Sequence, residues 1–560
     1  SHARFCCKFV YMESIRLRSI APLFYLIWLI LAIIQAANTE LLDDEAYYWT
    51  FSQHLDWGYF DHPPMTALLI RAGYWIFPNE LGVRLLCILL STGSIWLLEK
   101  MTIRKEPRLF YAIALSMIAL QLGGFLAVPD IPLLFFTALF FYRYDRFLKA
   151  ETLVNTLGLG ISAACLLYSK YHGVLILFFT LISHLRLLRS PRVYGAGLLA
   201  FLLFVPHLLW QYQHDFVSFR YHLQESNVNP YKLSYTIEYL VGQVLLPGPL
   251  IGLLLLPAAW LYRVTNPFER ALRFTAIGIY AFFLLSSFRG RVEGNWTAPA
   301  LIPLVLLAHA YIAEHNRWQR WVYRLLPVSL LLILVLRVGM MVDVIPAKAI
   351  SSRFHSWKTW PDTLKQRTNG LSVVWLNSYQ RASKYAFYSK QTTHSLNFYR
   401  ERRNNYNFWS IEDSLQNKPV VIADIYDMDR FTDSIQTPIG WVGYRIDSSF
   451  QGTSKYWFEP STTSMSAKTG DSLRFYGTFH RPVKGGRIAN ARIGVFQNGK
   501  WLEDWSVAGE IWYPSSDGEY FRTTLKQSLA PGNYVLVFAL NAPGLPPTHN
   551  SRKIKLTIVQ

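Results

Sequence analysis

A series of long apolar runs in the first 342 residues constrains the fold of this chain more than any other feature. A helix needs about 20 mainly apolar residues to cross the hydrocarbon core of a bilayer. Hydropathy therefore predicts a mainly α, polytopic transmembrane helical bundle of about 11 spans over residues 1–342. The runs lie near residues 19–37, 81–98, 109–127, 131–147, 153–168, 173–188, 193–209, 236–261, 272–287, 298–313 and 325–342.

Positive charge is distributed unevenly among the loops of this region. The net charge of +19 would by itself be compatible with nucleic acid binding. Before residue 342, however, most Lys and Arg residues lie in short loops between the apolar runs, at 100–108, 143–149, 186–192, 263–273 and 317–324. The positive-inside rule makes these loops cytoplasmic and the alternate loops external. We therefore predict a multi-pass membrane protein with an external C-terminus and no nucleic acid partner.

The chain changes to a polar, loop-rich texture after residue 342. A buried strand at 371–376 and a second at 420–425 alternate with helix-like stretches, which predicts a small α/β domain over residues 343–452. From residue 453 to residue 560 short strands and turns follow one another, including an Asn-Gly turn at 498–499. This pattern predicts a β-sandwich. We expect it to be a structural or docking module, with carbohydrate binding as the alternative.

The loop after the first apolar run has an unusual composition. Residues 41–65 read LLDDEAYYWTFSQHLDWGYFDHPPM, with three consecutive acids at the start and an acid beside a histidine at the end. The aromatic residues between them favour the boundary between membrane and water. A carboxylate at such a boundary acts strongly on a substrate because the effective dielectric constant is low. We interpret this loop as the active-site loop of a membrane enzyme.

The candidate functional side chains all lie in predicted external loops. They are Asp44 and Glu45, Asp61 and His62, Asp130, and Lys170 with His172. If the spans form a bundle, these loops converge on one cavity above the bilayer. Acids combined with Lys and His suit a substrate that carries a phosphate, with or without a divalent cation.

Each candidate also has a structural interpretation. Asp61 is placed to cap a helix that begins near Pro63, and Asp130 is placed to cap the fourth span. Lys170 and His172 are placed to anchor helix ends at the lipid headgroups. Arg84, inside an apolar run, either reaches the interface or binds phosphate, and the first of these is the simpler interpretation.

Several short motifs together resemble the GT-C glycosyltransferases. The pattern Asp44-Glu45-x-x-Tyr48 is followed by Phe60-Asp61-His62-Pro63-Pro64. The branch that this order resembles contains the lipid A aminoarabinose transferases and the protein O-mannosyltransferases, and the resemblance covers about residues 12–410. Further matching segments are PDIPLLFF at 129–136, SKYHG at 169–173, WQYQHDFVSF at 210–219, EGNWTAPA at 293–300 and RRNNYNFW at 402–409.

The resemblance implies a role for each candidate. It makes Asp44 the catalytic base. It further implies a site for the donor phosphate or a divalent metal, with Glu45, Tyr48, His62, Lys170 and His172 as substrate-binding residues and Asp61 and Asp130 as metal ligands. One position departs from the pattern: the aminoarabinose transferases carry Glu-Lys where this chain has Asp61-His62. A permanent positive charge is thereby replaced by a titratable one.

The predicted function is that of an inverting glycosyltransferase in the bacterial cytoplasmic (inner) membrane. The enzyme would move a sugar from a polyprenyl-phosphate donor to a hydroxyl of an envelope lipid, glycan or protein on the external face. No glycine-rich nucleotide-binding motif is present, as expected for a lipid-linked donor. Two alternatives stay open: a transporter or flippase of a lipid-linked sugar, and a metal-dependent membrane phosphatase.

Overall fold

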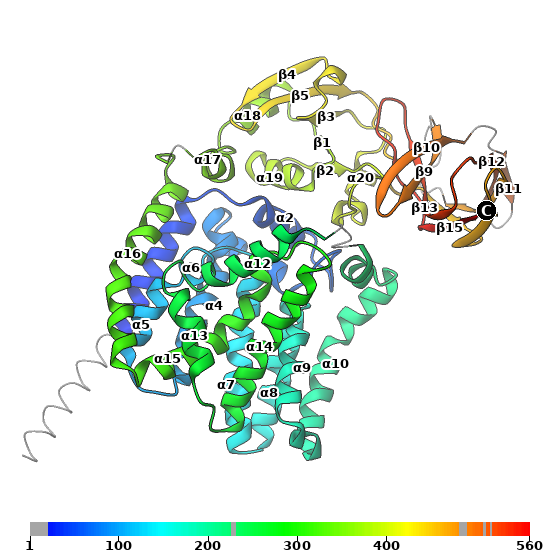
Figure 1. Ribbon diagram of the computed structural model, residues 1–560. Coiled ribbons are helices and arrows are strands. Elements are labelled where there is room, and N and C mark those ends of the chain that lie inside the picture. Colours follow the sequence, from blue (N-terminus) through cyan, green and yellow to red (C-terminus); the bar gives the residue numbers. More distant parts are fainter. Residues whose placement is uncertain (1–20, 226–230, 346, 481–489, 508–510, 516–517) are drawn as a thin grey trace, which may run out of the picture. The chain divides into compact units, whose positions relative to one another are not determined.

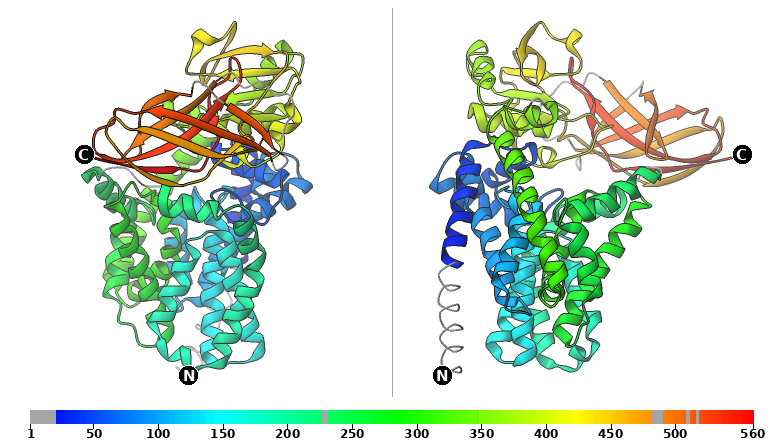
Figure 2. Two further views of the ribbon diagram at one scale, coloured as in Figure 1. Left: turned by 90° about the vertical axis from the view of Figure 1, so that its right-hand side faces the viewer. Right: turned by 60° about the vertical axis from the view of Figure 1, so that its left-hand side comes forward.

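The computed structural model divides the chain into two compact units, residues 1–355 and residues 356–560 (Figure 1). It describes residues 21–225, 231–345, 347–480, 490–507, 511–515 and 518–560. The first unit is helical, and the second combines an α/β lobe with β-sheets (Figure 2). The predicted three-part division at 342 and 452 is not tested by this arrangement and stays a prediction.

The first unit is built from helices that run beside one another (Figure 1). Two short helices, α2 (Asp43–Gln53) and α3 (Met65–Ile76), follow a first helix at Ala21–Asn38. The next elements are α4 (Glu80–Met101), α5 (Pro107–Ser116), α6 (Ile118–Gln121), α7 (Asp130–Lys149), α8 (Leu153–Ser169), α9 (Gly173–Ser183) and η1 (Leu185–Arg189). The remainder are α10 (Pro191–Gln213), α11 (Val217–Arg220), η2 (Tyr221–Glu225), α12 (Leu233–Leu245), α13 (Gly252–Leu261), α14 (Pro267–Ser287), η3 (Gly294–Ala300), α15 (Leu301–Ala313), α16 (Asn316–Met341) and α17 (Lys348–Phe354).

Five helices in the described part of the chain are each long and apolar enough to cross a membrane. The segment Gly294–Ala313 is 83% buried, whereas Ala21–Asn38, α10 and α16 are each 28% buried. Helix α15 therefore lies in the core of the bundle, and the other three present apolar faces to the outside, as lipid contact requires. The prediction of a polytopic helical bundle is confirmed, while the number of spans stays a prediction.

One predicted apolar run differs from the structure. Residues 236–261 form two helices, α12 and α13, and residues 246–251 between them contain Pro247, Gly248 and Pro249. Proline removes a backbone donor and glycine weakens a helix, so the hydropathy of this run persists through a break in its secondary structure. Hydropathy alone carries no signal for such a break.

The α/β lobe of the second unit has a mixed five-stranded sheet in the order β2-β1-β3-β5-β4. Strands β1 (Val373–Leu376), β2 (Thr393–Leu396) and β3 (Val420–Asp424) are parallel, with α19 (Tyr379–Ser389) between the first two. Strands β4 (Asp433–Thr437) and β5 (Gly440–Asp447) continue the sheet antiparallel. Shorter elements are α18 (Trp360–Arg367), η4 (Asn405–Asn407), α20 (Ile411–Leu415) and η5 (Met428–Arg430). The strands and helices predicted at 371–388 and 411–425 are present.

Two further sheets enclose an apolar core and confirm the predicted β-rich C-terminal region. One sheet has the order β10-β9-β13-β15-β7, with β14 on β13, and the other has the order β11-β12-β8-β6. The predicted Asn-Gly turn joins β9 to β10, and both of its residues have positive φ (51° and 76°), which Asn and Gly tolerate. The strands are β6 (Trp457–Pro460), β7 (Ser464–Lys468), β8 (Ser472–His480), β9 (Asn490–Gln497), β10 (Lys500–Ser506), β11 (Ile511–Ser515), β12 (Gly518–Lys526), β13 (Gly532–Asn541), β14 (Thr548–His549) and β15 (Ile554–Val559).

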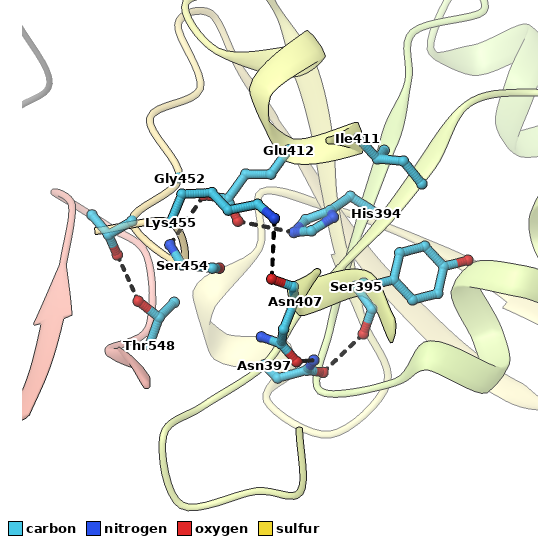
Figure 3. Close-up of polar contacts among 12 residues, drawn as sticks. His394, Ser395, Asn397, Asn407, Ile411, Glu412, Gly452, Ser454, Lys455 and Thr548 are labelled. Carbon is cyan, nitrogen blue, oxygen red and sulfur yellow. Dashed lines mark hydrogen bonds and ion pairs between the residues drawn. The ribbon is translucent and has the colours of Figure 1, made fainter. Parts of the chain in front are cut away.

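A buried polar cluster holds the α/β lobe to the segment that leads into these sheets (Figure 3). Glu412 of α20 lies 3.2 Å from His394 of β2 and accepts a hydrogen bond from the Ser454 backbone (3.0 Å). Burial alone would raise the pKa of Glu412, but the hydrogen bond and charge of His394 hold that pKa below its usual value. Lys455 donates to the Asn407 carbonyl (3.1 Å). The two parts of the second unit are therefore joined by fixed polar contacts.

Candidate active site

Helix α2 is held in place by a buried ion pair between Glu45 and Arg84 of α4. The Arg84 Nε and Nη2 atoms donate to the two Glu45 carboxylate oxygens at 2.8 and 2.6 Å, and both side chains have no exposed surface. The remaining Arg84 donors reach the carbonyls of Ala36, Thr39 and Glu40 at 2.6–2.9 Å. The guanidinium therefore ties the end of the first helix to the start of α2.

Glu45 also accepts hydrogen bonds from two backbone groups. Leu42 N–H donates to Oε2 (2.9 Å), and Ala127 N–H donates to Oε1 (2.8 Å) from the segment just before α7. These contacts give the carboxylate a structural role, and its predicted role in substrate binding stays a prediction. Sequence reasoning missed this pair because nothing in the local sequence around Arg84 indicates a partner 39 residues earlier.

The predicted base lies on the accessible side of α2. Asp44 is exposed in the first turn, where the helix dipole favours a carboxylate. Tyr48 follows one turn later, and residues four apart share a helix face. The Tyr48 hydroxyl lies 3.0 Å from His62 Nε2. Tyr48 of α2 therefore contacts the segment that carries Asp61 and His62, and Asp44 lies one turn before Tyr48.

His62 is neutral at physiological pH in this environment. Loss of solvation lowers the pKa of the ring to about 4, and the nearby charges of Lys170 and His222 act in the same direction against those of Asp61 and Asp130. Its Nδ1 atom is enclosed and has no hydrogen-bond partner among the described residues. The low pKa makes the His62 ring a neutral hydrogen-bonding group.

Lys170 and Asp130 form the second buried ion pair of the site. Lys170, which follows α8, donates to Asp130 Oδ1 at 2.7 Å, and the two residues are 6% and 7% exposed. Asn295 of η3 donates to the other oxygen, Oδ2, at 2.8 Å. Asp130 is the first residue of α7, and each of its carboxylate oxygens accepts a hydrogen bond from one of these side chains. The structure thus replaces the capping interpretation of Asp130 with a contact between three segments.

The structure also does not support the capping role considered for Asp61 or the anchoring role considered for His172. Asp61 does not cap α3, because that helix begins at Met65 with Pro64 at the N-cap. His172 precedes α9, and its ring contacts Phe283 and Trp296 with centroids 5.0 and 5.7 Å apart. His172 therefore packs against aromatic rings of α14 and η3.

A polar network that sequence analysis did not identify fixes the loop between α2 and α3. His207 of α10 bonds to the Trp57 carbonyl (2.7 Å) and lies 3.2 Å from the Tyr171 hydroxyl. Gln211 donates to Tyr171 (2.9 Å) and to Ser218 (2.7 Å). Gln211 and Ser218 belong to the matching segment 210–219, which was the available signal. His207 lies outside that segment, so the sequence held no signal for it.

Two further contacts complete the attachment of this loop. Ser218 donates to the Tyr59 carbonyl at 2.8 Å. The His222 ring lies 2.9 Å from the Asp61 carbonyl. The backbone on both sides of Asp61 is therefore held by side chains that follow α10.

An apolar cavity of about 380 Å³ lies between α12, α13, α14 and α15. Gln243 lines it and accepts a hydrogen bond from Thr297 of η3. Thr297 is two residues from Asn295, which donates to Asp130, so the segment η3 contacts both Gln243 of the cavity lining and the Lys170–Asp130 pair. The other lining residues are Tyr239, Leu240, Leu256, Ala259, Trp260, Arg273, Ala276, Ile277, Tyr280, Ala281, Leu284, Leu304 and Leu307.

Two carboxylates of the site, those of Asp61 and Asp130, were predicted to bind a divalent metal. Among the described residues, no group of three or more His, Cys, Asp or Glu side chains is arranged to hold a cation. Asp130 is already shared between an ammonium group and an amide. The role of Asp61 and Asp130 as ligands of a divalent metal stays a prediction.

Comparisons with known proteins agree with this architecture. The family model described as dolichyl-phosphate-mannose-protein mannosyltransferase matches residues 61–210. The ArnT structure from Cupriavidus metallidurans bound to undecaprenyl phosphate has a TM-score of 0.56 and 13% identity, covering 76% of this chain and 98% of ArnT. Its apo structure has a TM-score of 0.57 over the same shares. The chain therefore resembles the GT-C membrane glycosyltransferases, and its fold is similar to that of ArnT.

A curated protein similar to this chain is the lipid A galacturonosyltransferase RgtD of Rhizobium johnstonii. It is 26% identical over 299 residues, which are 48% of this chain and 60% of the relative. The chain therefore spans about 60% of the length of the curated relative it matches. The predicted resemblance to the GT-C glycosyltransferases is confirmed.

The matched family segment contains one part of the candidate site. It begins at Asp61 and includes His62, Asp130, Lys170 and His172. Because α2 ends at Gln53, the segment contains no part of that helix. The predicted roles of Asp44, Glu45 and Tyr48 are therefore supported by the short motif and by the geometry of α2 and its ion pair, and not by the family model.

Proposed function

We propose that this GT-C chain transfers a sugar from a polyprenyl-phosphate donor to a hydroxyl of an envelope lipid. The observation that carries the proposal is the buried Lys170–Asp130 pair, whose charges act on His62, in a helical unit that also contains an apolar cavity. A donor with an isoprenoid chain and a phosphate needs this combination of apolar and cationic groups. RgtD, named for lipid A, and ArnT, named with bound undecaprenyl phosphate, support the choice of acceptor and donor.

The chemical demands of the reaction match the side chains present. Because the leaving group is a phosphate, it departs without much help from a general acid. The acceptor hydroxyl must lose its proton as positive charge develops at the anomeric carbon, and exposed Asp44 is the base that takes it. Lys170 supplies positive charge for the departing phosphate, and neutral His62 offers a hydrogen bond. Attack in one step inverts the anomeric carbon.

The same proposal assigns a location to the chain. Clusters of Lys and Arg lie in the loops that the positive-inside rule assigns to the cytoplasm, which supports a multi-pass protein of the bacterial inner membrane with residues 343–560 on the periplasmic side. We expect a periplasm-dependent reporter fused to Gln560 to be active. A fusion active only in the cytoplasm would reverse this orientation.

Removal of the Lys170 charge tests the proposed donor site. We expect Lys170→Ala to reduce sugar transfer by about 100-fold, the usual cost of losing one group that stabilises developing negative charge. The measurement is transfer of radiolabelled sugar from a polyprenyl-phosphate donor to purified envelope lipids. Lys149→Ala is the matched control, since Lys149 lies at the other end of α7 in an exposed pair with Asp145.

Three outcomes contradict the proposal. Full activity of Lys170→Ala shows that the ion pair is structural. Release of free sugar or phosphate without an acceptor indicates a phosphatase. Movement of the intact donor across vesicle membranes without transfer indicates a flippase.

A further inference from the structure

Among the described residues, Arg84 and Arg337 lie buried within helices of the first unit, and their surroundings differ. Arg84 has a carboxylate and three carbonyls as partners for its guanidinium. Arg337 of α16 is 8% exposed, and its guanidinium makes one hydrogen bond, from Nη2 to the Gln121 carbonyl (2.7 Å). In the part of the chain that the structure describes, no Asp or Glu forms an ion pair with Arg337. Its charge is therefore not neutralised by the described protein.

The atoms around Arg337 have unused hydrogen-bonding capacity. The Arg337 Nε is enclosed and lacks a partner among the described residues, and so does the Oε1 atom of Gln35. Gln35 is attached to the same place, because its Nε2 donates to the Arg337 carbonyl at 3.2 Å. A buried cation that lacks a counter-charge is unfavourable in a low-dielectric environment. An anion that approaches the guanidinium removes this cost.

An apolar groove is linked to this arginine through Gln121. It has a volume of about 140 Å³ and lies between the helix Ala21–Asn38 and the helices α5 and α6. Gln121 both lines the groove and supplies the carbonyl that binds Arg337. The remaining lining residues, all apolar in character, are Phe24, Ile27, Trp28, Leu31 and Leu115.

The level of Arg337 along its helix suits a lipid headgroup. It lies four residues before Met341, the last residue of α16, which is about 6 Å of helix. Gln35 lies three residues before the end of its own helix, Asn38. The guanidinium is therefore near the helix ends, while the groove extends from Gln121 along the helix toward Phe24.

We propose that Arg337 and this groove bind an anionic phospholipid, with the phosphate on the guanidinium and one acyl chain in the groove. A phosphate matches the planar donors of arginine and supplies the missing negative charge. The groove supplies an apolar surface for the chain. This site is built from α16, α5, α6 and the first helix, whereas the Lys170–Asp130 pair is built from α7, the end of α8 and η3. It does not depend on the proposed sugar transfer.

The test compares two lipids that differ only in headgroup charge. The full-length protein in detergent is titrated with dioleoyl phosphatidylglycerol or dioleoyl phosphatidylcholine, and bound lipid is counted by native mass spectrometry. We expect phosphatidylglycerol to bind more tightly, and Arg337→Gln to weaken its binding by about tenfold without changing that of phosphatidylcholine. Arg324→Gln is the matched control, because Arg324 is exposed on the same helix.

A second variant keeps the charge and fills the groove. Leu31→Trp places a larger side chain among the lining residues and is expected to weaken phosphatidylglycerol binding while Arg337 is intact. If Arg337→Gln fails to fold, phosphatidylglycerol binding by Leu31→Trp tests the proposed site instead.

Four results overturn the proposal. The first is equal binding of the two lipids by the unaltered protein, and the second is unchanged phosphatidylglycerol binding in both variants. The third is displacement of phosphatidylglycerol by inorganic phosphate at equal concentration. The fourth is its displacement by polyprenyl phosphate at equal concentration. The third result indicates a site for a free anion. The fourth assigns Arg337 to the donor.

Discussion

Replacement of Asp44 by Asn is expected to reduce sugar transfer by about 10²–10⁴-fold, the usual contribution of a general base. The amide keeps the shape of the carboxylate but cannot accept the acceptor's proton. Because Asp44 is exposed and is not part of the buried Glu45–Arg84 pair, the fold is expected to persist. The measurement is turnover with a radiolabelled polyprenyl-phosphate sugar at matched expression, together with donor binding, which should be largely retained.

Asp43→Asn is the control for this result, since Asp43 precedes Asp44 in the same helical turn. We expect it to have a much smaller effect, because the motif aligns the base with the acid directly before Glu45. A dead Asp43 variant with an active Asp44 variant places the base one residue earlier. Activity in both variants removes the α2 loop from the chemistry.

Replacement of Arg84 by Leu is expected to lower the free energy of unfolding of the first unit by about 3–5 kcal/mol. This is the usual cost of leaving one member of a buried ion pair without its partner. Both side chains are fully buried, and the carbonyls of Ala36, Thr39 and Glu40 lose their donors as well. The measurement is thermal unfolding of the purified protein in detergent, with sugar transfer assayed below the transition.

The double variant Arg84→Leu/Glu45→Leu separates charge from packing. It removes the unpaired carboxylate, so we expect it to recover part of the lost stability. Arg71→Leu is the control, since Arg71 of α3 makes a single exposed hydrogen bond to Gln53. Normal stability of Arg84→Leu would show that the ion pair does not hold α2.

Much of the fold could be predicted because its signals are local. Apolar runs of bilayer length indicated the helical unit, and alternating strands with an Asn-Gly turn indicated the β-rich region. The break at Pro247–Gly248–Pro249 was missed because hydropathy measures composition and not backbone continuity. The number of spans is subject to the same limit.

The candidate site was predictable in its members but not in its contacts. Asp61, His62, Asp130 and Lys170 were recognised because charged groups beside apolar runs are costly and therefore conspicuous. Their partners were not, since Asn295 lies 165 residues from Asp130 and the Trp57 carbonyl lies 150 residues from His207. Such pairs depend on how helices pack, which no local pattern encodes.

The sequence by itself determined that this chain enters a membrane, where its cations gather and which loop carries its acids, because burial of apolar and charged groups depends on residue type. Only the tertiary structure decided which charges neutralise one another. Glu45 is enclosed by Arg84, Lys170 is paired with Asp130, and Arg337 has a single carbonyl. The physical reason is distance: an ion pair requires atoms within about 4 Å, and helix packing alone sets those distances.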